Sequence, residues 1–373
     1  MMPKRRVLFL VPILRRAGAE TQLVILVNRL PGENFQKHIL SYRPGDDLKD
    51  DLDVSEVTIH ELHRKGRLDF EVGKQVGRII DEHEIDTVHC TLQNALLFGY
   101  MGICFSKRKP KLIASIHTTK NASIKLDIAD QLVYRPLLKR CDQVWFVSTR
   151  QAELWAKKMP FMAGKSITIH NGIDLDEFEP TSFESAGQAL RESLGISDNE
   201  KVLCSIAGFR TEKLHSVLLD AFSQIRREGV LCRLLLAGAG PTEQALREQV
   251  RALDLDKSVE FLGSLSDVRS VLVASDCKVL VSAAETFSMA MLEAMAMQVP
   301  VITTSIGGAA EAIDDNVNGL LIRPGNAVEL ARKIKFILSD DGRRKRMGIK
   351  ARQVVVERFS VEQMVAKSAQ QLI

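Results

Sequence analysis

Short apolar runs alternate with amphipathic stretches along the whole chain. In the first half these runs are continuously apolar, which is typical of parallel strands covered on both faces. Helical patterns lie between them, at residues 20–30, 70–82 and 128–140. The alternation predicts a doubly wound parallel sheet built from βαβ units. The expected strands are Val7–Val11, His38–Tyr42, Val57–His60, Thr87–Cys90, Leu112–Ile116, Val144–Val147 and Ile167–Ile169.

The alternation pauses at residues 174–188, which are acidic and polar and contain Pro180. This composition predicts a linker or a loop-rich junction between domains. A chain of 373 residues also suggests two domains, at roughly 100–200 residues each. We therefore expect an α/β protein of two Rossmann-like domains, at residues 1–178 and 179–360. The second would contain the strands Val202–Ile206, Leu234–Ala237, Val259–Phe261, Val279–Val281, Val301–Thr303 and Leu320–Ile322.

The composition excludes several classes of protein. The formal charge is only +4, so no nucleic-acid partner is expected. No run approaches the roughly 20 apolar residues of a membrane span. Residues 7–14 imitate the core of a signal peptide, but this run is short, contains Pro12 and is followed by two arginines. A first β-strand is the favoured interpretation.

Six cysteines are scattered along the chain and form no C-x-x-C pair. This pattern indicates neither a disulfide framework nor a zinc site. Most of the cysteines lie in apolar, strand-like runs, where cysteine behaves as a small buried hydrophobe. We therefore expect a protein of the reducing cytoplasm.

Positive charge is concentrated in residues 103–140. This stretch has nine Lys and Arg residues against Asp127 and Asp130, so its charge is 9 − 2 = +7. A solvated face is one interpretation. The other is a patch for anionic lipid or for a phosphorylated acceptor.

The segment 285–304 follows an expected strand at 277–282 and opens a helix. Its two glutamates, Glu285 and Glu293, stand eight positions apart and would lie at different depths of one cleft. Thr286 or Ser288 can cap the start of the helix. The alternative is a capped amphipathic helix that exposes Glu293 to solvent.

Backbone amides at the start of this helix form a candidate anion site. The free N–H groups of Phe287, Ser288 and Met289 would point at the cleft, together with the positive end of the helix dipole. A diphosphate suits such a site.

These residues and their neighbours resemble the retaining GT-B glycosyltransferases of glycosyltransferase family 4. Glu285 and Glu293 match the E-x7-E element of that family, and the run AMAMQVPVITTSIGGAAEAIDDNVNGLLIRPGN follows it as the family pattern requires. Five other segments resemble family motifs and occur in the family's order: AGAETQL (17–23), CDQVWFVST (141–149), ITIHNGIDLDEF (167–178), LLLAGAGP (234–241) and VEFLGSLSDV (259–268).

The resemblance implies a GT-B fold, in which the two domains face each other across a cleft and a C-terminal helix at about residues 361–373 crosses back to the first domain. It implies transfer of a sugar from a nucleotide-diphosphate sugar, most simply a UDP-sugar, with retention of anomeric configuration. The acceptor would be a saccharide or a lipid-linked molecule in surface-polysaccharide or lipopolysaccharide synthesis. The hypothesis places the enzyme in the cytoplasm, peripheral to the inner face of the membrane.

The resemblance also assigns roles to residues of the second domain. Lys213 and Arg210 would stabilise the leaving diphosphate without a metal or other cofactor, because no D-x-D motif stands at a strand end. Glu293 would bind the ribose hydroxyls, and the backbone around Phe261 and Leu262 would hold the base. One departure is Gly208, which stands where the family often has arginine. A second is Gln298, in place of a glycine.

In the first domain, the resemblance selects Gly18 and His117. Gly18 opens a helix, and its lack of a side chain would let the backbone approach a phosphate closely. Ala17 replaces the first of two glycines that the family usually has there. His117 ends a strand and, with Glu285, would position the donor sugar. His89 and His170 are expected to be structural.

Two other functions stay open from the sequence. One is a GT-B-like sugar-nucleotide epimerase, and the other is a non-catalytic subunit that binds a nucleotide sugar. The set of Glu285, Glu293 and Lys213 argues against the second, and the departure at Gly208 keeps it open.

Overall fold

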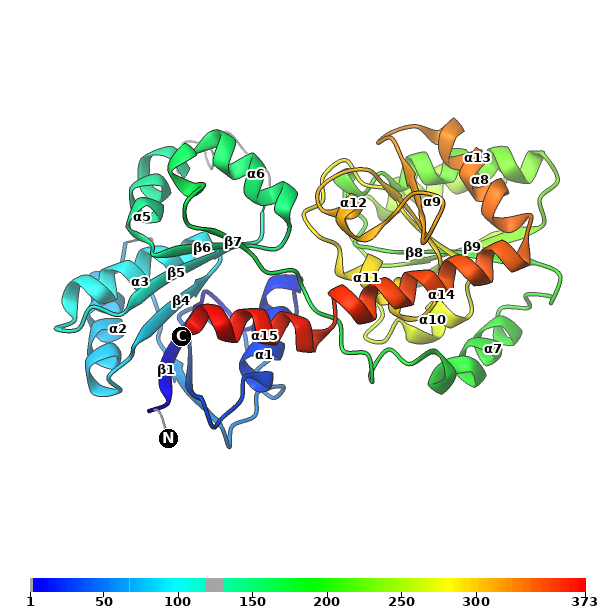
Figure 1. Ribbon diagram of the computed structural model, residues 1–373. Helices are drawn as coiled ribbons and strands as arrows, with labels where there is room; N and C mark the ends of the chain where they lie inside the picture. The colour runs from blue at the N-terminus through cyan, green and yellow to red at the C-terminus, as the bar shows by residue number, and fades with distance from the viewer. Residues whose placement is uncertain (1–2, 67, 119–129) are drawn as a thin grey trace. The chain divides into compact units, whose positions relative to one another are not determined.

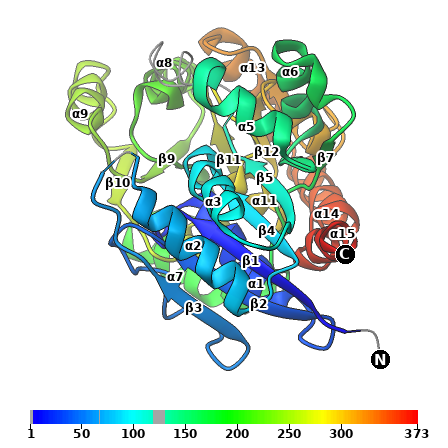
Figure 2. The same ribbon diagram turned by 90° about the vertical axis from the view of Figure 1, so that its left-hand side faces the viewer.

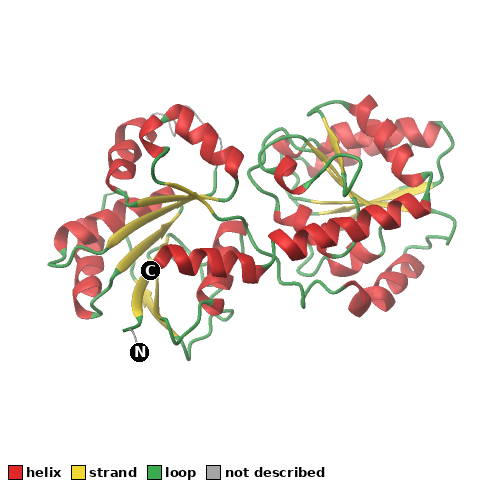
Figure 3. Ribbon diagram, in the orientation of Figure 1, coloured by secondary structure: helices red, strands yellow, loops and turns green. Residues whose placement is uncertain are grey.

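The computed structural model describes residues 3–66, 68–118 and 130–373. The chain forms two compact units, Met1–Gly172 with Val361–Ile373, and Ile173–Ser360. Each unit contains a parallel β-sheet with helices on both faces (Figures 1 and 3). The fold class predicted from the sequence is therefore confirmed.

The first unit has a seven-stranded sheet in the order β3-β2-β1-β4-β5-β6-β7. Its strands are β1 (Arg5–Val11), β2 (Phe35–Ser41), β3 (Val57–Glu61), β4 (Thr87–Thr91), β5 (Lys111–Ile116), β6 (Gln143–Phe146) and β7 (Ser166–Thr168). Its helices are α1 (Gly18–Arg29), α2 (Phe70–Glu82), α3 (Gln93–Phe105), α5 (Arg135–Arg140), α6 (Thr149–Lys158) and α15 (Val361–Leu372), with short turns η1 (Asp130–Tyr134) and η2 (Pro160–Met162).

Strand β1 explains why the apolar runs do not alternate with polar residues. Leu8 and Leu10 point into a core formed with α2 and α3. Val7, Phe9 and Val11 point into the opposite core, which includes residues of α1 and α15. Because both faces of the sheet are buried here, every position of β1 from Val7 to Val11 is apolar, while Arg5 and Arg6 stand at its more exposed start. Helix α15 packs against α1 in this unit (Figure 1).

The second unit has a six-stranded sheet in the order β10-β9-β8-β11-β12-β13. Its strands are β8 (Lys201–Ile206), β9 (Cys232–Ala237), β10 (Val259–Gly263), β11 (Cys277–Leu280), β12 (Val301–Thr304) and β13 (Leu320–Ile322). Its helices are α7 (Glu184–Ser193), α8 (His215–Arg227), α9 (Glu243–Ala252), α10 (Arg269–Val273), α11 (Met289–Ala296), α12 (Ala309–Ala312), α13 (Ala327–Leu338) and α14 (Asp341–Arg358), with short turns η3 (Pro180–Phe183) and η4 (Thr211–Lys213).

Helix α7 corrects part of the linker prediction. Residues 184–188 are helical rather than loop-like. Gly187 allows a close approach, since a Cβ there would lie 3.0 Å from the backbone nitrogen of Ala274. Arg191 then donates a hydrogen bond to the Ala274 carbonyl at 2.9 Å. The packing of α7 against α10 therefore stabilises this helix. The Ser and Gly residues in its first turn have low helix propensity, so the sequence does not predict it.

The strand order places a ligand site in each unit. The first strand of each sheet has neighbours on both sides that follow it in sequence, β2 and β4 around β1, and β9 and β11 around β8. Open α/β sheets bind ligands at the carboxyl ends of the strands at such a point. None of the described helices is long and apolar enough to cross a membrane.

Candidate functional site

Two loops meet at the carboxyl edge of the second sheet. The loop after β8 ends in the turn η4, and the loop after β11 carries Glu285. The Ala283 amide donates a hydrogen bond to the Glu212 carbonyl at 2.8 Å. Beside this bond, Lys213 Nζ lies 2.5 Å from Glu285 Oε2, and these side chains are only 14% and 22% exposed. The structure therefore brings two of the predicted site residues into direct contact.

Gly307 holds the backbone of the Glu285 loop in place. Its φ is +54°, and a Cβ there would lie 2.3 Å from the Glu285 carbonyl oxygen and 2.6 Å from that of Thr286. The next amide, of Gly308, donates to the Thr286 carbonyl at 2.7 Å. A side chain at position 307 is therefore excluded both by the close approach and by the left-handed backbone.

Helix α11 begins one residue after its cap, Ser288, whose hydroxyl accepts a hydrogen bond from the Met291 amide. Of the two caps predicted, Ser288 is thus confirmed. Met289 is the first residue of the helix, while the buried Phe287 ring packs against Phe359 at 5.2 Å between ring centroids. Ser288 also lines a pocket of about 220 Å³, together with Ser282, Glu285, Met291, Thr303, Thr304, Ile306 and Ala309. Glu285 and the first residues of α11 therefore line the same pocket.

Glu293 lies one turn into α11 and is half-buried. Burial raises its pKa, and the positive charge of Lys278 opposes that effect. Lys278 is fully buried in β11, and its Nζ has no hydrogen-bond partner among the described residues. Lys278 is not among the residues predicted from the motifs, although a lysine inside an apolar strand is a visible signal. Its charge favours the ionised, hydrogen-bond-accepting form of Glu293.

Arg210 occupies a different position from Lys213. Its side chain is 59% exposed and pairs with Glu212 at 3.1 Å. A Cβ built on Gly208 would lie 3.7 Å from Arg210 Nε, which is an ordinary contact distance. The guanidinium of Arg210 therefore lies next to the space that a side chain at position 208 would enter.

Two glycines support the loop that precedes Lys213. A Cβ at Gly238 would lie 2.1 Å from the Ala207 carbonyl oxygen, and a Cβ at Gly240 would lie 2.3 Å from that of Phe209. The Phe209 amide donates to the Ala239 carbonyl at 3.0 Å. The segment Gly238–Gly240 thus acts as a close-packed support for the loop.

The strand β10 is irregular at the predicted base-binding position. Its pairing with β9 shifts register between Phe261 and Gly263, so Leu262 is the residue that the pairing skips. A bulged residue has backbone groups that the sheet does not use. The Phe261 ring lies under the Arg247 guanidinium, 4.1 Å from it. Leu262 therefore has backbone groups available to a ligand at the edge of the sheet.

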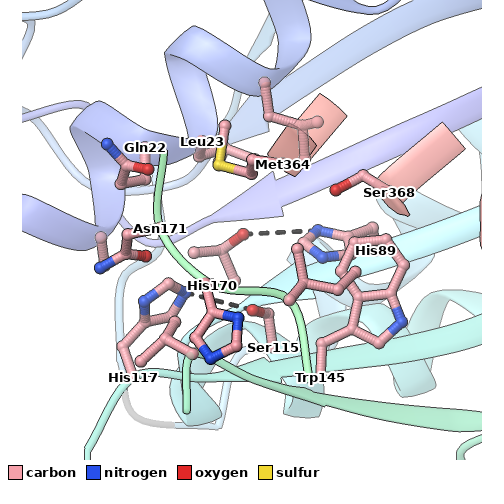
Figure 4. A pocket seen from close by; sticks show the side chains of 15 residues that line it. Gln22, Leu23, His89, Ser115, His117, Trp145, His170, Asn171, Met364 and Ser368 are labelled. Atoms are coloured by element: carbon pink, nitrogen blue, oxygen red, sulfur yellow. Dashed lines mark hydrogen bonds between the residues drawn. The ribbon is translucent and has the colours of Figure 1, made fainter. Parts of the chain in front are cut away.

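The first unit has its own pocket, of about 400 Å³ (Figure 4). His117 lies in it, and His117 Nε2 is 3.1 Å from Ser115 Oγ. Burial lowers the pKa of His117 to about 4, so its ring is neutral at pH 7. Gly18 is not part of the lining, but its neighbour Ala19 is. A Cβ at Gly18 would meet no atom within 4 Å, and α1 begins without a side-chain cap.

Sequence reasoning gave His89 and His170 structural roles, yet both line this pocket with His117. Burial, with a contribution from His117, lowers the pKa of His89 to about 3. A usable signal was the place of His89 inside an apolar strand and of His170 two residues beyond the end of another. Other polar residues of the lining are Gln22, Thr91, Ser115, Asn171 and Ser368, and Trp145 provides an aromatic surface. Neutral imidazoles, hydroxyls and amides beside an indole ring suit hydrogen bonding to an uncharged, hydroxyl-rich ligand.

The basic stretch 103–140 is only partly described, since Lys120, Lys125 and Asp127 lie outside the described residues. Arg108 forms ion pairs with Glu84 and Asp86, and Lys111 donates to the Gln371 carbonyl at 2.7 Å. Several of these cations therefore have partners within the protein.

Comparison with known proteins identifies the chain. The family model described as Glycosyltransferase Family 4 matches residues 16–177, and the model described as Glycosyl transferases group 1 matches residues 187–354. The chain belongs to glycosyltransferase family 4. A curated relative, the N-acetyl-alpha-D-glucosaminyl L-malate synthase of Bacillus anthracis, is 28% identical over 317 residues, which are 84% of this chain and 81% of the relative.

Solved structures agree with this glycosyltransferase assignment at the level of the fold. A glycosyltransferase from Rickettsia africae has a TM-score of 0.86 and 22% identity, and covers 99% of this chain and 98% of its own. Anabaena Alr3699/HepE in complex with UDP has a TM-score of 0.84 and 22% identity, and covers 99% of both chains. Both are similar to this glycosyltransferase along the full chain.

Proposed function

We propose that this glycosyltransferase transfers a sugar from a UDP-sugar to a saccharide or lipid-linked acceptor, with retention at the anomeric carbon and without a metal. The observation that carries the proposal is the contact between Lys213 and Glu285 beside the start of α11. It gathers a cation, a carboxylate and helix amides at the carboxyl edge of one sheet. The cation and the helix amides are the groups that bind a donor diphosphate.

The diphosphate would bind between Lys213 and the start of α11. When the sugar leaves, negative charge grows on the diphosphate, and a fixed cation and fixed amides stabilise that charge. The amides of Ser288 and Met289 are the candidates, with that of Phe287 at the entrance to the helix. Arg210, exposed and next to the space at Gly208, would supply a second positive charge.

The proposal needs no metal, because Lys213 and Arg210 supply the positive charge. In the second unit, all of whose residues are described, no three carboxylate, histidine or cysteine side chains lie close enough together to hold an ion. Glu285, released from Lys213 when the phosphate binds, would face the donor sugar. Transfer would be front-face, and the leaving phosphate would accept the proton of the acceptor hydroxyl.

The remaining parts of the donor have candidate partners nearby. Glu293 would accept hydrogen bonds from the ribose hydroxyls; burial raises its pKa, and the charge of Lys278 opposes that effect. The backbone at Phe261 and the bulged Leu262 would bind the edge of the base. Anabaena Alr3699/HepE, solved with UDP and with UDP-glucose, supports the choice of a uridine nucleotide.

The pocket of the first unit would bind the acceptor and the hydroxyls of the transferred sugar. His117 is neutral at pH 7 and can either donate or accept a hydrogen bond there. Gly18, which opens α1, would let a phosphate approach the helix amides. Relatives with lipid acceptors, such as the alpha-monoglucosyldiacylglycerol synthase of Streptococcus pneumoniae, support a lipid-linked acceptor.

The donor is tested first by thermal stabilisation. UDP and UDP-sugars should raise the melting temperature, since a ligand that binds only the folded state stabilises it, and GDP or ADP should not. Lys213→Ala should then reduce kcat/KM about 10–100-fold, the cost of one charged hydrogen bond at ~1.5–3 kcal/mol. Lys335→Ala, which removes an exposed lysine paired with Glu228, is the control and should keep full activity.

Three outcomes would contradict the proposal. Unchanged turnover in Lys213→Ala would show that Lys213 does not stabilise the leaving diphosphate. Loss of activity in EDTA would contradict the metal-free mechanism, and an inverted anomeric centre by NMR would contradict retention. An epimerised donor formed without any acceptor would instead favour an epimerase.

A membrane-surface location of the acceptor has its own test. Leu132 and Val133 of η1 are 72% and 41% exposed, and the basic residue Arg135 stands two positions after Val133. Such a pairing of apolar and basic side chains suits an anionic lipid surface. Binding to anionic vesicles should weaken with salt and with Leu132→Ser/Val133→Ser. Absent or salt-independent binding would contradict this location.

A further inference from the structure

Three histidine side chains meet in the first unit. His38 lies in β2, His60 in β3, and His83 caps the carboxyl end of α2. Figure 2 labels these two strands and this helix. Each ring offers one nitrogen, and the three nitrogens all lie within 4.8 Å of one another. The ring centroids are 4.6, 5.1 and 5.4 Å apart. No other group of three His, Cys, Asp or Glu side chains within the described residues has this property.

The fold brings these histidines together from distant parts of the sequence. Strands β2 and β3 are parallel, with His38 opposite Thr58 and His60 opposite Leu40. Since side chains alternate between the two faces of a strand, His38 and His60 point to the same face. That face is covered by α2, and His83 ends this helix, where its amide donates to the Ile79 carbonyl at 3.1 Å.

The cluster is not explained by packing alone. His38 Nδ1 and His60 Nε2 lie 3.1 Å apart, a hydrogen bond between two imidazoles. His38 is fully buried, and its Nε2 has no partner among the described residues. A buried polar atom without a partner costs about 1–3 kcal/mol. The three imidazoles therefore include a buried ring nitrogen that no described residue of the protein uses.

We propose that His38, His60 and His83 bind a zinc ion that ties the edge strand β3 to β2 and α2. Zinc prefers neutral imidazole nitrogens in a tetrahedral arrangement, and three histidines leave one position for water. At zinc–nitrogen distances of ~2.1 Å the nitrogens lie about 3.4 Å apart, so small side-chain rotations would close the cluster around the ion. His60 and His83 are half-buried, which gives the ion a path from solvent.

The ion would have a structural role. All three ligands belong to the first unit, whereas the residues assigned to the diphosphate belong to the second. Strand β3 is the last strand of its sheet and pairs on one side only. A metal that links an edge strand to the next strand and to a helix restricts local opening, and its binding energy adds to folding energy.

The test uses the full chain without a histidine tag, freed of metal and then titrated with Zn²⁺ or Co²⁺. One equivalent of Zn²⁺ should bind, and at 100 times its Kd it should raise the melting temperature by about 5–10 °C. One equivalent of Co²⁺ should produce the visible absorption of a four-coordinate nitrogen site. His60→Gln and His83→Gln should each abolish both signals.

His63→Gln and Cys104→Ser are the matched controls, since each removes an exposed metal-binding side chain outside the cluster. Both should bind metal as the unchanged protein does. X-ray absorption of the zinc-loaded, unsubstituted protein should show three imidazole ligands, which tests the site even if a variant fails to fold. No binding at micromolar zinc, binding that survives both cluster variants, or a sulfur ligand would overturn the proposal.

Discussion

Gly307 offers a direct test of how the Glu285 loop is held. In Gly307→Ala, a methyl group would lie 2.3 Å from the Glu285 carbonyl oxygen and 2.6 Å from that of Thr286. Cβ atoms do not approach other heavy atoms within 3.0 Å, so the loop must move by at least 3.0 − 2.3 = 0.7 Å. This displacement would carry Glu285 away from Lys213.

The expected cost has two parts. A left-handed backbone costs alanine about 1–2 kcal/mol more than glycine, less about 0.4–1 kcal/mol for the stiffer unfolded chain. Overpacking adds about 1–3 kcal/mol. We therefore expect a loss of about 1–4.6 kcal/mol, or roughly 2–18 °C in the melting temperature of a unit of this size.

Gly325→Ala is the matched control. Gly325 has φ +74° in the same unit, and a Cβ there would meet no atom within 4 Å. It therefore measures the backbone cost alone, about 0–1.6 kcal/mol. Calorimetry gives both stabilities, and UDP-sugar binding well below the melting temperature separates misplacement of the loop from unfolding. Equal stability losses in the two variants, with donor binding unchanged in Gly307→Ala, would refute the reasoning.

Two other predictions follow from close packing and from burial. Gly102→Ala should destabilise the first unit by about 1–3 kcal/mol in urea unfolding, because the new Cβ would lie 2.3 Å from Val76 Cγ1. Alanine has the better helix propensity, so a variant more stable than the unchanged protein would contradict this prediction. His215→Phe should flatten the pH dependence of the second unit. Burial, with the nearby Lys213, lowers the pKa of His215 to about 4, so the unfolded state binds more protons and stability falls as pH drops from 6.5 to 4. The slope should decrease by at most about 1.4 kcal/mol per pH unit, and an unchanged slope would show that His215 does not titrate in this way.

The strands were predictable because burial on both faces removes the polar positions from them. The expected strands Val7–Val11 and Val301–Thr303 lie within β1 and β12. Helix α7 was not predictable in the same way, because the close contact of Gly187 with α10 exists only in the folded protein. The local pattern therefore predicts the strands that are buried on both faces, and it misses a helix that depends on tertiary contacts of Gly187 and Arg191.

Some parts of the candidate site could likewise be predicted from the sequence, and others could not. Lys213, Glu285 and Ser288 stand in recognisable motifs, so the sequence selected them and the structure places them at one edge of the sheet. Gly307 also lies in a recognisable motif. The reason for a glycine there is its contact with carbonyl oxygens 21 and 22 residues earlier, and that contact is visible only in the fold. The three-histidine cluster gave no signal, because 22 and 23 residues separate its members and no spacing rule connects them.

The return of α15 to the first unit has a consequence for how this protein is made. The core that α1 and β1 share is completed by Met364 and Leu372, which are synthesised after the whole of the second unit. Before these two residues are made, the first unit lacks part of the core to which Leu23 and Val27 belong, so apolar surface there stays exposed. The second unit is built from contiguous residues. It can therefore complete its fold before residues 361–373, which the first unit needs, have been made.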